Sequence, residues 1–562
     1  MECRILLTLF LHAIAGTALS QDRLSGKSFA TRSEVLARNG MVATNHPLAT
    51  QIGIDILKKG GSAIDAAIAA NAFLGFADPG MCGIGGDLFA IVWDAKTKQL
   101  YGLNASGRSP ETLTFSHLQS QKEKGNDYDR GPLSVTAPGC VDGWFQLHGK
   151  FGKLPVAELL QPTIRYAQEG VPVTQETADF FALDEQRIKK KNNPNFEKVF
   201  FINGRFPRKG EIFKNPGLAR TLDIISKKGR AGFYEGEVAN AIESHIKSRG
   251  GFLTRNDLKK HQSEWVKPVS VNYRGYDVWE LPPNTQGIAA LQMLTILEGF
   301  NMAAMTYGST EHIHTLVEAK KLAYEDRAVY YGDPDFNKLP IDSLISKHYA
   351  ESRRKLIDPA KANIYHAGLG SRNHTVYLTV ADKEGNMISL IQSLCSGFGS
   401  EEVIDDFGFA LQNRGIEFVL DRNHINCYAP GKRPFHTIMP GFVTKNGNPF
   451  LSFGVMGGDM QPQGQVQILL NIIDFGMNVQ EAGDAPRIFH DGTKSYTGHL
   501  ETVGDTFIES GFEMEVIRDL IDKGHNIRML PGIFGGYQAI MLKDGVYYGA
   551  SDARKDGHAA GY

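Results

Sequence analysis

Runs of strand-forming residues gather toward the two ends of this 562-residue chain, and the middle is mostly helical in pattern. Apolar, β-rich runs bounded by turn residues predict strands at 40–44, 89–93, 100–103, 375–381, 387–393, 407–412, 437–444, 450–455 and 537–548. Helical spacing predicts helices that include 47–58, 63–76, 156–169, 216–228, 237–248, 311–331, 461–475 and 512–523. This order predicts one large α/β unit whose two ends pair with each other, and not a string of separate domains.

Composition and charge narrow the class of protein. Hydrophobic residues make up 42% of the chain and charged residues 22%, which is typical of a globular protein. The formal net charge is -2, so neither nucleic acid nor an anionic membrane is indicated as a partner.

Residues 1–20 have the pattern of a secretory signal peptide. Arg4 precedes an apolar run at 5–15, and small residues follow before Gln21. The run is too short to span a bilayer, and no other uninterrupted apolar stretch reaches the length of a membrane span. We therefore expect cleavage near Ser20 and a secreted protein, with a short membrane anchor as the alternative.

Cysteine usage and glycosylation motifs fit an extracellular chain without a disulfide scaffold. Cys3 would leave with the signal peptide, and the four cysteines that remain allow one or two bridges at most: Cys82, Cys140, Cys395 and Cys427. No Cys-x-x-Cys pair or His-rich cluster indicates a metal, and nothing indicates a cofactor. Glycosylation motifs begin at Asn104 and Asn373. A glycan on Asn373 would crowd Thr375, so we expect that motif to be unused.

Thr375 opens a predicted hairpin, with a β-rich run, a polar turn at 382–386 and a second β-rich run. A threonine there is ordinarily just a strand residue, because threonine is enriched in strands. If the bond between His374 and Thr375 is cut, the new α-amino group lies beside the hydroxyl. That amine can serve as the base that makes the hydroxyl a nucleophile.

Three further features could complete such a site. Gly457 and Gly458 follow an apolar strand-like run, and their exposed N–H groups could hold an oxyanion, although a plain turn is the simpler interpretation. Arg108 lies in a loop of small residues and could clamp a carboxylate, or it could be an ordinary surface residue. His436 and Thr437 lie between two prolines, and His436 could act in acid/base chemistry or be structural.

Several ordered motifs resemble the γ-glutamyltransferase (glutathione hydrolase) family, especially its glutathione hydrolase-like proenzymes. They are residues 83–86, 106–110, 375–386, 397–400, 411–415, 430–437 and 455–460. Together they cover most of the mature chain, from about residue 35 to about residue 560. The signal-peptide pattern is similar to that of secreted animal members, some of them venom proteins.

The resemblance implies a four-layer αββα sandwich of the N-terminal-nucleophile hydrolase type. It implies cleavage between His374 and Thr375, which would give a signal peptide at 1–20, a large subunit at 21–374 and a small subunit at 375–562. Both subunits, made from one precursor, would stay associated. The implied activity is hydrolysis or transfer of the γ-glutamyl group of glutathione and other γ-glutamyl amides, with water or an amino acid as acceptor.

The resemblance also assigns roles to single residues. Thr375 would be the nucleophile, and Ser393 would hydrogen-bond to it. Gly457 and Gly458 would bind the oxyanion, and Arg108 would bind the α-carboxylate of the substrate.

Other positions depart from typical members of the family. Glu417 stands where they carry an aspartate for the substrate amino group, and Arg414 stands where they carry Gln or Glu. His436 and Thr437 replace a pair of serines, and Cys395 replaces an asparagine. A pocket that recognises charged groups discriminates strongly when its partners change. An acidic run, Glu401, Glu402, Asp405 and Asp406, could also lie near the pocket mouth and disfavour anionic glutathione.

Three functions therefore compete. The first is a secreted, self-cleaving γ-glutamyl hydrolase or transferase. The second is a related N-terminal-threonine amidase with another acyl group, as in the cephalosporin acylases. The third is a secreted effector, such as a venom protein, with weak or no catalysis.

Overall fold

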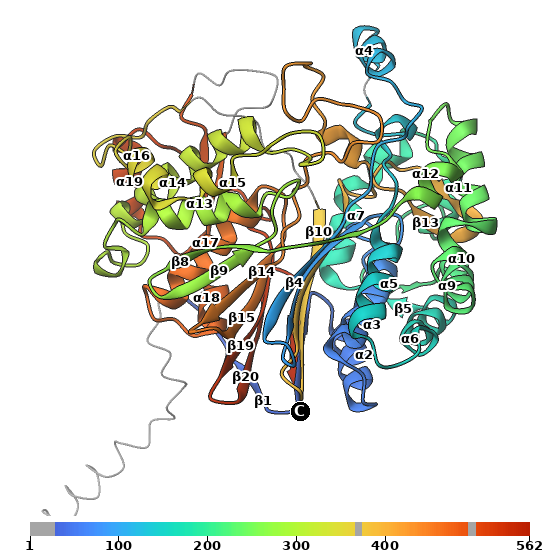
Figure 1. Cartoon of the computed structure of the whole chain (residues 1–562), viewed down its shortest axis with the longest axis horizontal. Coiled ribbons are helices and arrows are strands. Elements are labelled where there is room, and N and C mark those ends of the chain that lie inside the picture. Colours follow the sequence, from blue (N-terminus) through green and yellow to red (C-terminus); the bar gives the residue numbers. More distant parts are fainter. Residues whose placement is uncertain (1–28, 127, 366–373, 493–501) are drawn as a thin grey trace, which may run out of the picture.

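Two seven-stranded sheets face each other at the centre of the molecule, and helices cover the outer face of each (Figure 1). The computed structural model describes residues 29–126, 128–365, 374–492 and 502–562. The layers run helix, sheet, sheet, helix across the view in Figure 1. The expected four-layer αββα sandwich is confirmed.

The first sheet combines strands from the start, the middle and the end of the chain. Its order is β1 (Val35–Ala37), β20 (Val546–Ser551), β19 (Tyr537–Lys543), β15 (Asn448–Val455), β14 (Gly441–Lys445), β9 (Tyr276–Glu280) and β8 (Val269–Tyr273). Each strand is antiparallel to its neighbours.

The second sheet contains the hairpin that begins near Thr375. Its order is β21 (His558–Gly561), β2 (Gly40–Thr44), β10 (His374–Asp382), β11 (Met387–Cys395), β3 (Asp87–Asp94), β4 (Gln99–Ala105) and β7 (Glu264–Val266). All of its strand pairs are antiparallel too. The expected pairing of the two ends is confirmed, because β21 lies against β2 and β20 against β1.

The helices form one group on each sheet (Figure 1). The group on the second sheet comprises α2 (Pro47–Lys58), α3 (Ala63–Ala77), α5 (Cys140–Phe151), α6 (Val156–Glu169), α7 (Gln175–Lys189), α8 (Pro194–Phe200), α9 (Pro216–Lys228), α10 (Ala231–Tyr234), α11 (Gly236–Ser248) and α12 (Arg255–Lys260). The group on the first sheet comprises α13 (Gly287–Leu297), α14 (Thr310–Tyr330), α15 (Ile341–Leu344), α16 (Lys347–Arg354), α17 (Met460–Ile473), α18 (Val479–Asp484) and α19 (Met514–Asp522). A further helix, α4 (Phe115–Glu123), lies at the top of Figure 1.

The core has three main parts, one between the sheets and one under each helical layer. Tyr377 and Phe442 lie fully buried in the part between the sheets. Helix α3 is buried on nearly every side, as its small and apolar residues predict, and Ser62 caps it through a hydrogen bond from the N–H of Asp65. Each fully buried large apolar side chain contributes roughly 1.5–3 kcal/mol, so these layers hold β10 in a fixed position.

The structure corrects parts of the expected strand pattern. The strands β7, β8 and β9 lie in the stretch expected to be mostly helical. The run 537–548 is a hairpin of two strands, because Asp544 and Gly545 both have positive φ and make a tight turn. The expected strand at 407–412 shrinks to β13 (Phe409–Ala410), and the one at 437–444 begins only at Gly441.

Within the described residues, no helix combines the length and the apolar character that crossing a membrane requires. The expected signal peptide at 1–20 and the motif at Asn373 lie outside the described residues.

Candidate active site

Thr375 lies at the head of β10 on the face that meets the other sheet. Residues 375, 377 and 379 share that face, because strand side chains alternate. The Thr379 hydroxyl lies 2.7 Å from the Ser452 hydroxyl, and the Tyr377 ring packs on Gly454 of β15. Continuing this pattern by two residues along β10 and β15 places Thr375 level with residue 456, which immediately precedes Gly457. Its side chain is 3% exposed, and its Oγ1 has no hydrogen-bond partner among the described residues.

A β-bulge opposite Thr375 brings Ser393 to it. His374 pairs with Cys395 and Val376 with Gln392, so Ser393 and Leu394 together face the single residue Thr375. The Ser393 hydroxyl accepts a hydrogen bond from the Cys395 N–H at 2.8 Å. The bulge thus places a second hydroxyl in the strand next to the candidate nucleophile.

The glycine pair forms a turn. Within the described residues its carbonyl groups accept hydrogen bonds, and its N–H groups donate none. Gly457 and Gly458 have φ values of 108° and 57°, which glycine adopts without strain. The Gln286 amide donates to the Gly458 carbonyl at 2.9 Å, and the Met460 N–H donates to the Gly457 carbonyl at 3.0 Å. Neither glycine N–H donates a hydrogen bond within the described part of the chain. Two donors therefore stand near Thr375, and their oxyanion role stays a prediction.

Arg414 joins most of the other predicted residues into one buried network. It begins η4 (Arg414–Glu417), a short 3-10 turn, and its side chain is 0% exposed. One nitrogen donates to the Thr437 hydroxyl at 2.9 Å, and the other donates to the Ser393 hydroxyl at 3.3 Å. The Glu417 carboxylate lies 3.7 Å from the same guanidinium. The Arg414 guanidinium is thus hydrogen-bonded to Ser393, which lies beside Thr375.

Cys395 borders this network without competing as a nucleophile. Its sulfur lies 3.7 Å from a Glu417 carboxylate oxygen. Burial raises the pKa of the Cys395 thiol to about 12, so the thiol stays protonated at neutral pH.

His436 is held by an aspartate that sequence reasoning missed. Its Nε2 lies 2.9 Å from Asp87 Oδ2, and the ring packs edge-on against Phe89. Asp87 Oδ1 accepts hydrogen bonds from the N–H groups of Gly107 and Gly139 and from the Gln412 amide. Asp87 also pairs with Ser393 between β3 and β11. The position of Asp87, directly after the glycine motif at 83–86, is the signal that could have found it.

Burial sets the charge of this pair. It lowers the pKa of His436 well below 6.5, with Arg414 adding to the effect. It also raises the pKa of Asp87 to about 7, although Arg414 and the hydrogen bonds act in the opposite direction. His436 is therefore neutral at physiological pH, and it acts as a hydrogen-bond donor that fixes the segment before Thr437.

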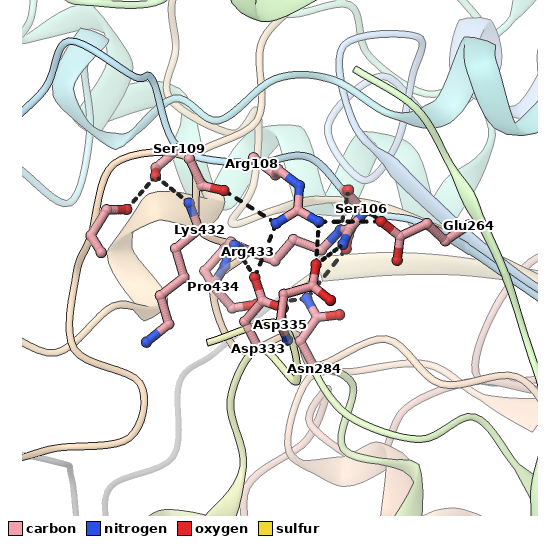
Figure 2. A network of polar contacts seen from close by, with 12 residues as sticks. Ser106, Arg108, Ser109, Glu264, Asn284, Asp333, Asp335, Lys432, Arg433 and Pro434 are labelled. Atoms are coloured by element: carbon pink, nitrogen blue, oxygen red, sulfur yellow. Dashed lines mark hydrogen bonds and ion pairs between the residues drawn. The ribbon is translucent and has the colours of Figure 1, made fainter. Parts of the chain in front are cut away.

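Arg108 lies in a second network, which Figure 2 shows. Its guanidinium contacts the carboxylates of Asp335 at 2.5 Å, Glu264 at 3.2 Å and Asp333 at 3.3 Å. Arg433 shares the Glu264 carboxylate at 2.7 Å. Carboxylates of this chain thus already occupy the position expected for a substrate carboxylate. No contact among the described residues links Arg108 to Ser393, Arg414 or Thr437, and its substrate role stays a prediction.

Arg108 also lines a separate cavity of 230 Å³, together with Lys260, Glu111, Asp257 and Glu264. Both signs of charge face this space, so it suits a small polar molecule better than an apolar one.

Burial contradicts the expected glycan on Asn104, whereas the expected position of the acidic run near the pocket mouth stays a prediction. Asn104 is 6% exposed and donates through its amide to Asn284 at 2.9 Å, so the folded chain does not offer that nitrogen to a glycan. The four acidic residues expected near the pocket mouth are each paired with a cationic or histidine side chain: Glu401 with Arg130, Arg187 and Lys191, Glu402 with His245 and Arg249, and Asp405 and Asp406 with Lys198.

The sandwich, with a buried threonine heading one of its central strands, is that of an N-terminal-nucleophile hydrolase. A family model described as gamma-glutamyltranspeptidase matches residues 49–562. The chain belongs to the gamma-glutamyltranspeptidase family.

Individual relatives carry two kinds of name. The glutathione hydrolase-like YwrD proenzyme of Bacillus subtilis is 38% identical, over 94% of this chain and 99% of that protein. The acylase ACY 1 proenzyme of Pseudomonas sp. strain SE83 is 34% identical, over 92% of each. The crystal structure of cephalosporin acylase from Bacillus halodurans is 41% identical with a TM-score of 0.87, over 97% of this chain and 99% of that one.

Proposed function

We propose that this chain is a proenzyme that cuts itself between His374 and Thr375 and then hydrolyses or transfers an acyl group through Thr375. The Thr375 α-amino group takes the hydroxyl proton while Oγ1 attacks the amide carbonyl. The N–H groups of Gly457 and Gly458 hold the oxyanion. The C–N bond breaks as the amine leaves with the proton, and water or an amino acid then takes the acyl group from Thr375.

Support for the nucleophile comes from its surroundings. Thr375 Oγ1 is buried without a hydrogen-bond partner among the described residues, beside Ser393 and level with the glycine pair. A structural threonine in a strand normally uses its hydroxyl, because a buried polar group without a partner costs roughly 1–3 kcal/mol. The relatives named above as proenzymes favour a chain that is processed into two parts.

The acyl group is proposed to carry a carboxylate. Arg414 supplies the observation behind this proposal, because a fully buried guanidinium that bonds both Ser393 and Thr437 presents a fixed positive charge next to Thr375. The γ-glutamyl group of glutathione and related amides is the first candidate, with Glu417 available for its amino group.

A second candidate is a glutaryl-type acyl group, which lacks that amino group. The ion pair between Glu417 and Arg414 favours it, since Glu417 then already has a cationic partner. The acylase names among the relatives point the same way.

The test uses the purified full chain and its Thr375→Ala variant. Denaturing gels should show two fragments of about 39 and 21 kDa for the parent chain, and N-terminal sequencing of the smaller one should begin at Thr375. The variant should stay as one band and turn over neither γ-glutamyl-p-nitroanilide nor glutaryl-p-nitroanilide. A variant that is cut or active contradicts the proposed nucleophile, and the ratio of the two activities identifies the acyl group.

Secretion is proposed from residues 1–20 alone. Sequencing the N-terminus of the large fragment from the natural source should then begin near Gln21.

A further inference from the structure

Three potential metal ligands meet in a buried cluster remote from Thr375 in the sequence. His314 and Glu318 lie one turn apart on α14, and His525 follows α19. One ligand atom from each residue lies within 4.8 Å of the other two, and Nδ1 of His314 lies 2.8 Å from Nε2 of His525. All three side chains are at most 4% exposed. The sequence shows no such group, because the two histidines are 211 residues apart.

The hydrogen bonds of His314 determine which of its nitrogens can bind a metal. Its Nε2 lies 2.8 Å from the Asp358 carbonyl, which can only accept, so Nε2 carries the proton. Nδ1 therefore accepts the hydrogen bond from His525 Nε2. When zinc binds both nitrogens, His525 carries its proton on Nδ1 instead. A backbone carbonyl that orients a histidine in this way is the usual outer partner of a metal ligand.

The carboxylate of the cluster is held in place by its own partners. Glu318 supplies a carboxylate whose position is fixed by the Asn363 N–H at 3.2 Å and by Lys321 Nζ at 2.7 Å.

We propose that His314, Glu318 and His525 form a zinc site. Two imidazoles and one carboxylate are ligands that Zn²⁺ accepts in tetrahedral geometry, with water at the fourth position. Tetrahedral ligands about 2.0 Å from the ion lie about 3.3 Å apart. The two nitrogens, now 2.8 Å apart, must therefore separate by about half an ångström, and ligand atoms that lie up to 4.8 Å apart must draw together.

Lys321 Nζ lies 2.7 Å from a Glu318 carboxylate oxygen, so a bound ion shares this carboxylate with the Lys321 side chain.

The three proposed ligands come from both sides of the proposed cut in the sequence. His314 and Glu318 precede residue 374, whereas His525 follows it, and Asp358 and Asn363 lie on the segment that leads toward the cut. Bound zinc ties the two chains together. This last consequence rests on the proposed cleavage, and the zinc site itself does not.

The experiment is a zinc titration of the chelator-treated full chain, followed by calorimetry and metal analysis. We expect one zinc per chain and a higher Tm. His525→Gln should weaken binding by more than the roughly 10–100-fold that loss of an outer partner costs. Glu318→Gln keeps the shape of the site and should also weaken binding. His348→Ala, at an exposed histidine, is the matched control and should bind as the parent does.

Two measurements keep the outcome clear. Cobalt in place of zinc should give the visible absorption of a tetrahedral site, which His525→Gln should lose. Thr375→Ala should bind zinc like the parent, so the site is tested even if the proposed function fails. Less than stoichiometric zinc in the folded parent, or unchanged affinity in both folded site variants, overturns the proposal.

Discussion

Two arginines compete for the role of carboxylate binder, and their surroundings distinguish them. Arg108 is surrounded by three carboxylates of this chain, whereas Arg414 has one carboxylate at 3.7 Å and two hydroxyl partners. A guanidinium already saturated with carboxylates gains less from another one. The buried cation beside Ser393 is therefore the better partner for a substrate carboxylate.

Replacing each arginine by glutamine tests this difference. Arg414→Gln should lower kcat/KM for a carboxylate-bearing amide by about 10–100-fold, because a charge-assisted bond contributes about 1.5–3 kcal/mol. Arg108→Gln, the matched control, should change it by less than threefold. Steady-state kinetics on both p-nitroanilides, after gels confirm cleavage, provide the measurement. A larger loss in Arg108→Gln assigns the carboxylate to the second network.

How much of the site the sequence predicts depends on the range of the contacts. Ser393, Arg414, Glu417 and Thr437 were expected at the site from family motifs, and the structure joins them. Asp87 was missed, because its hydrogen-bond partners come from loops near residues 107, 139, 412 and 436. Only the folded chain brings these loops together. Arg108 shows the converse, since the loop motif does not reveal the three carboxylates that surround it.

At the level of elements, local patterns predict well where one face is clearly apolar or a cap is present. The helix 47–58 and the strand 40–44 agree with α2 and β2 to the residue. The hairpin β8–β9 was missed although Arg274 and Gly275, both at positive φ, make a tight turn between alternating runs. The strand expected at 437–444 begins late, because His436 and Thr437 are held by Asp87 and Arg414 and not by a sheet.

The contact between β10 and β15 determines where Thr375 lies relative to the glycine turn. A Cβ added at Gly454 would lie 2.4 Å from the Tyr377 ring, so Gly454→Ala must push the two sheets apart locally. We expect a loss of about 1–3 kcal/mol in unfolding free energy, typical of overpacking, and slower self-cleavage. Urea unfolding and a time course on gels measure the two effects.

Gly149→Ala is the control for that substitution. Nothing lies within 4 Å of a Cβ at Gly149, which is inside α5, so alanine there should stabilise by about 0.5–1 kcal/mol. Equal stability of the two variants contradicts the idea that close packing on Tyr377 holds β10 in place.

On the scale of the whole molecule, the cut would separate two chains that share both sheets. Each sheet contains strands from both sides of residue 374. The two chains meet at β1–β20 and β14–β9 in the first sheet and at β21–β2, β2–β10 and β11–β3 in the second. Every such boundary is a ladder of backbone hydrogen bonds beside buried apolar residues, so separation requires unfolding. We expect the cut protein to elute as one species under native conditions and to separate only in denaturant. Native elution of a free fragment of about 21 kDa contradicts this expectation.

Buried titratable groups make the stability of the molecule depend on pH. Burial lowers the pKa of eight histidines: to about 4 for His46, His261 and His312, to about 3 for His525, well below 6.5 for His436 and His490, and below 6.5 for His314 and His558. It raises the pKa of six carboxyl groups: to about 7 for Asp78 and Asp87, well above 4.5 for Glu280, and above 3.8 for Asp326, Asp474 and Asp484.

The two sets act in opposite directions. Below pH 6.5 the unfolded chain binds a proton at each histidine that the folded chain does not, so each histidine lowers stability as pH falls. Each carboxyl group binds its proton in the folded chain first, so it raises stability as pH falls from about 7 to about 4. The histidines outnumber the carboxyl groups, so the unfolded chain binds more protons than the folded chain near pH 5.5.

The free energy of unfolding should therefore fall as pH drops through about 5.5, by roughly 1.4 kcal/mol per pH unit for each extra proton on the unfolded chain. His312→Asn keeps an acceptor for the Gly308 N–H, which bonds the ring at 3.1 Å, and removes one of these protons. Its pH dependence should be shallower by about one proton. Urea midpoints between pH 7.5 and 5 in the presence of chelator measure both slopes. Stability that rises on acidification would mean that the carboxyl groups outweigh the histidines.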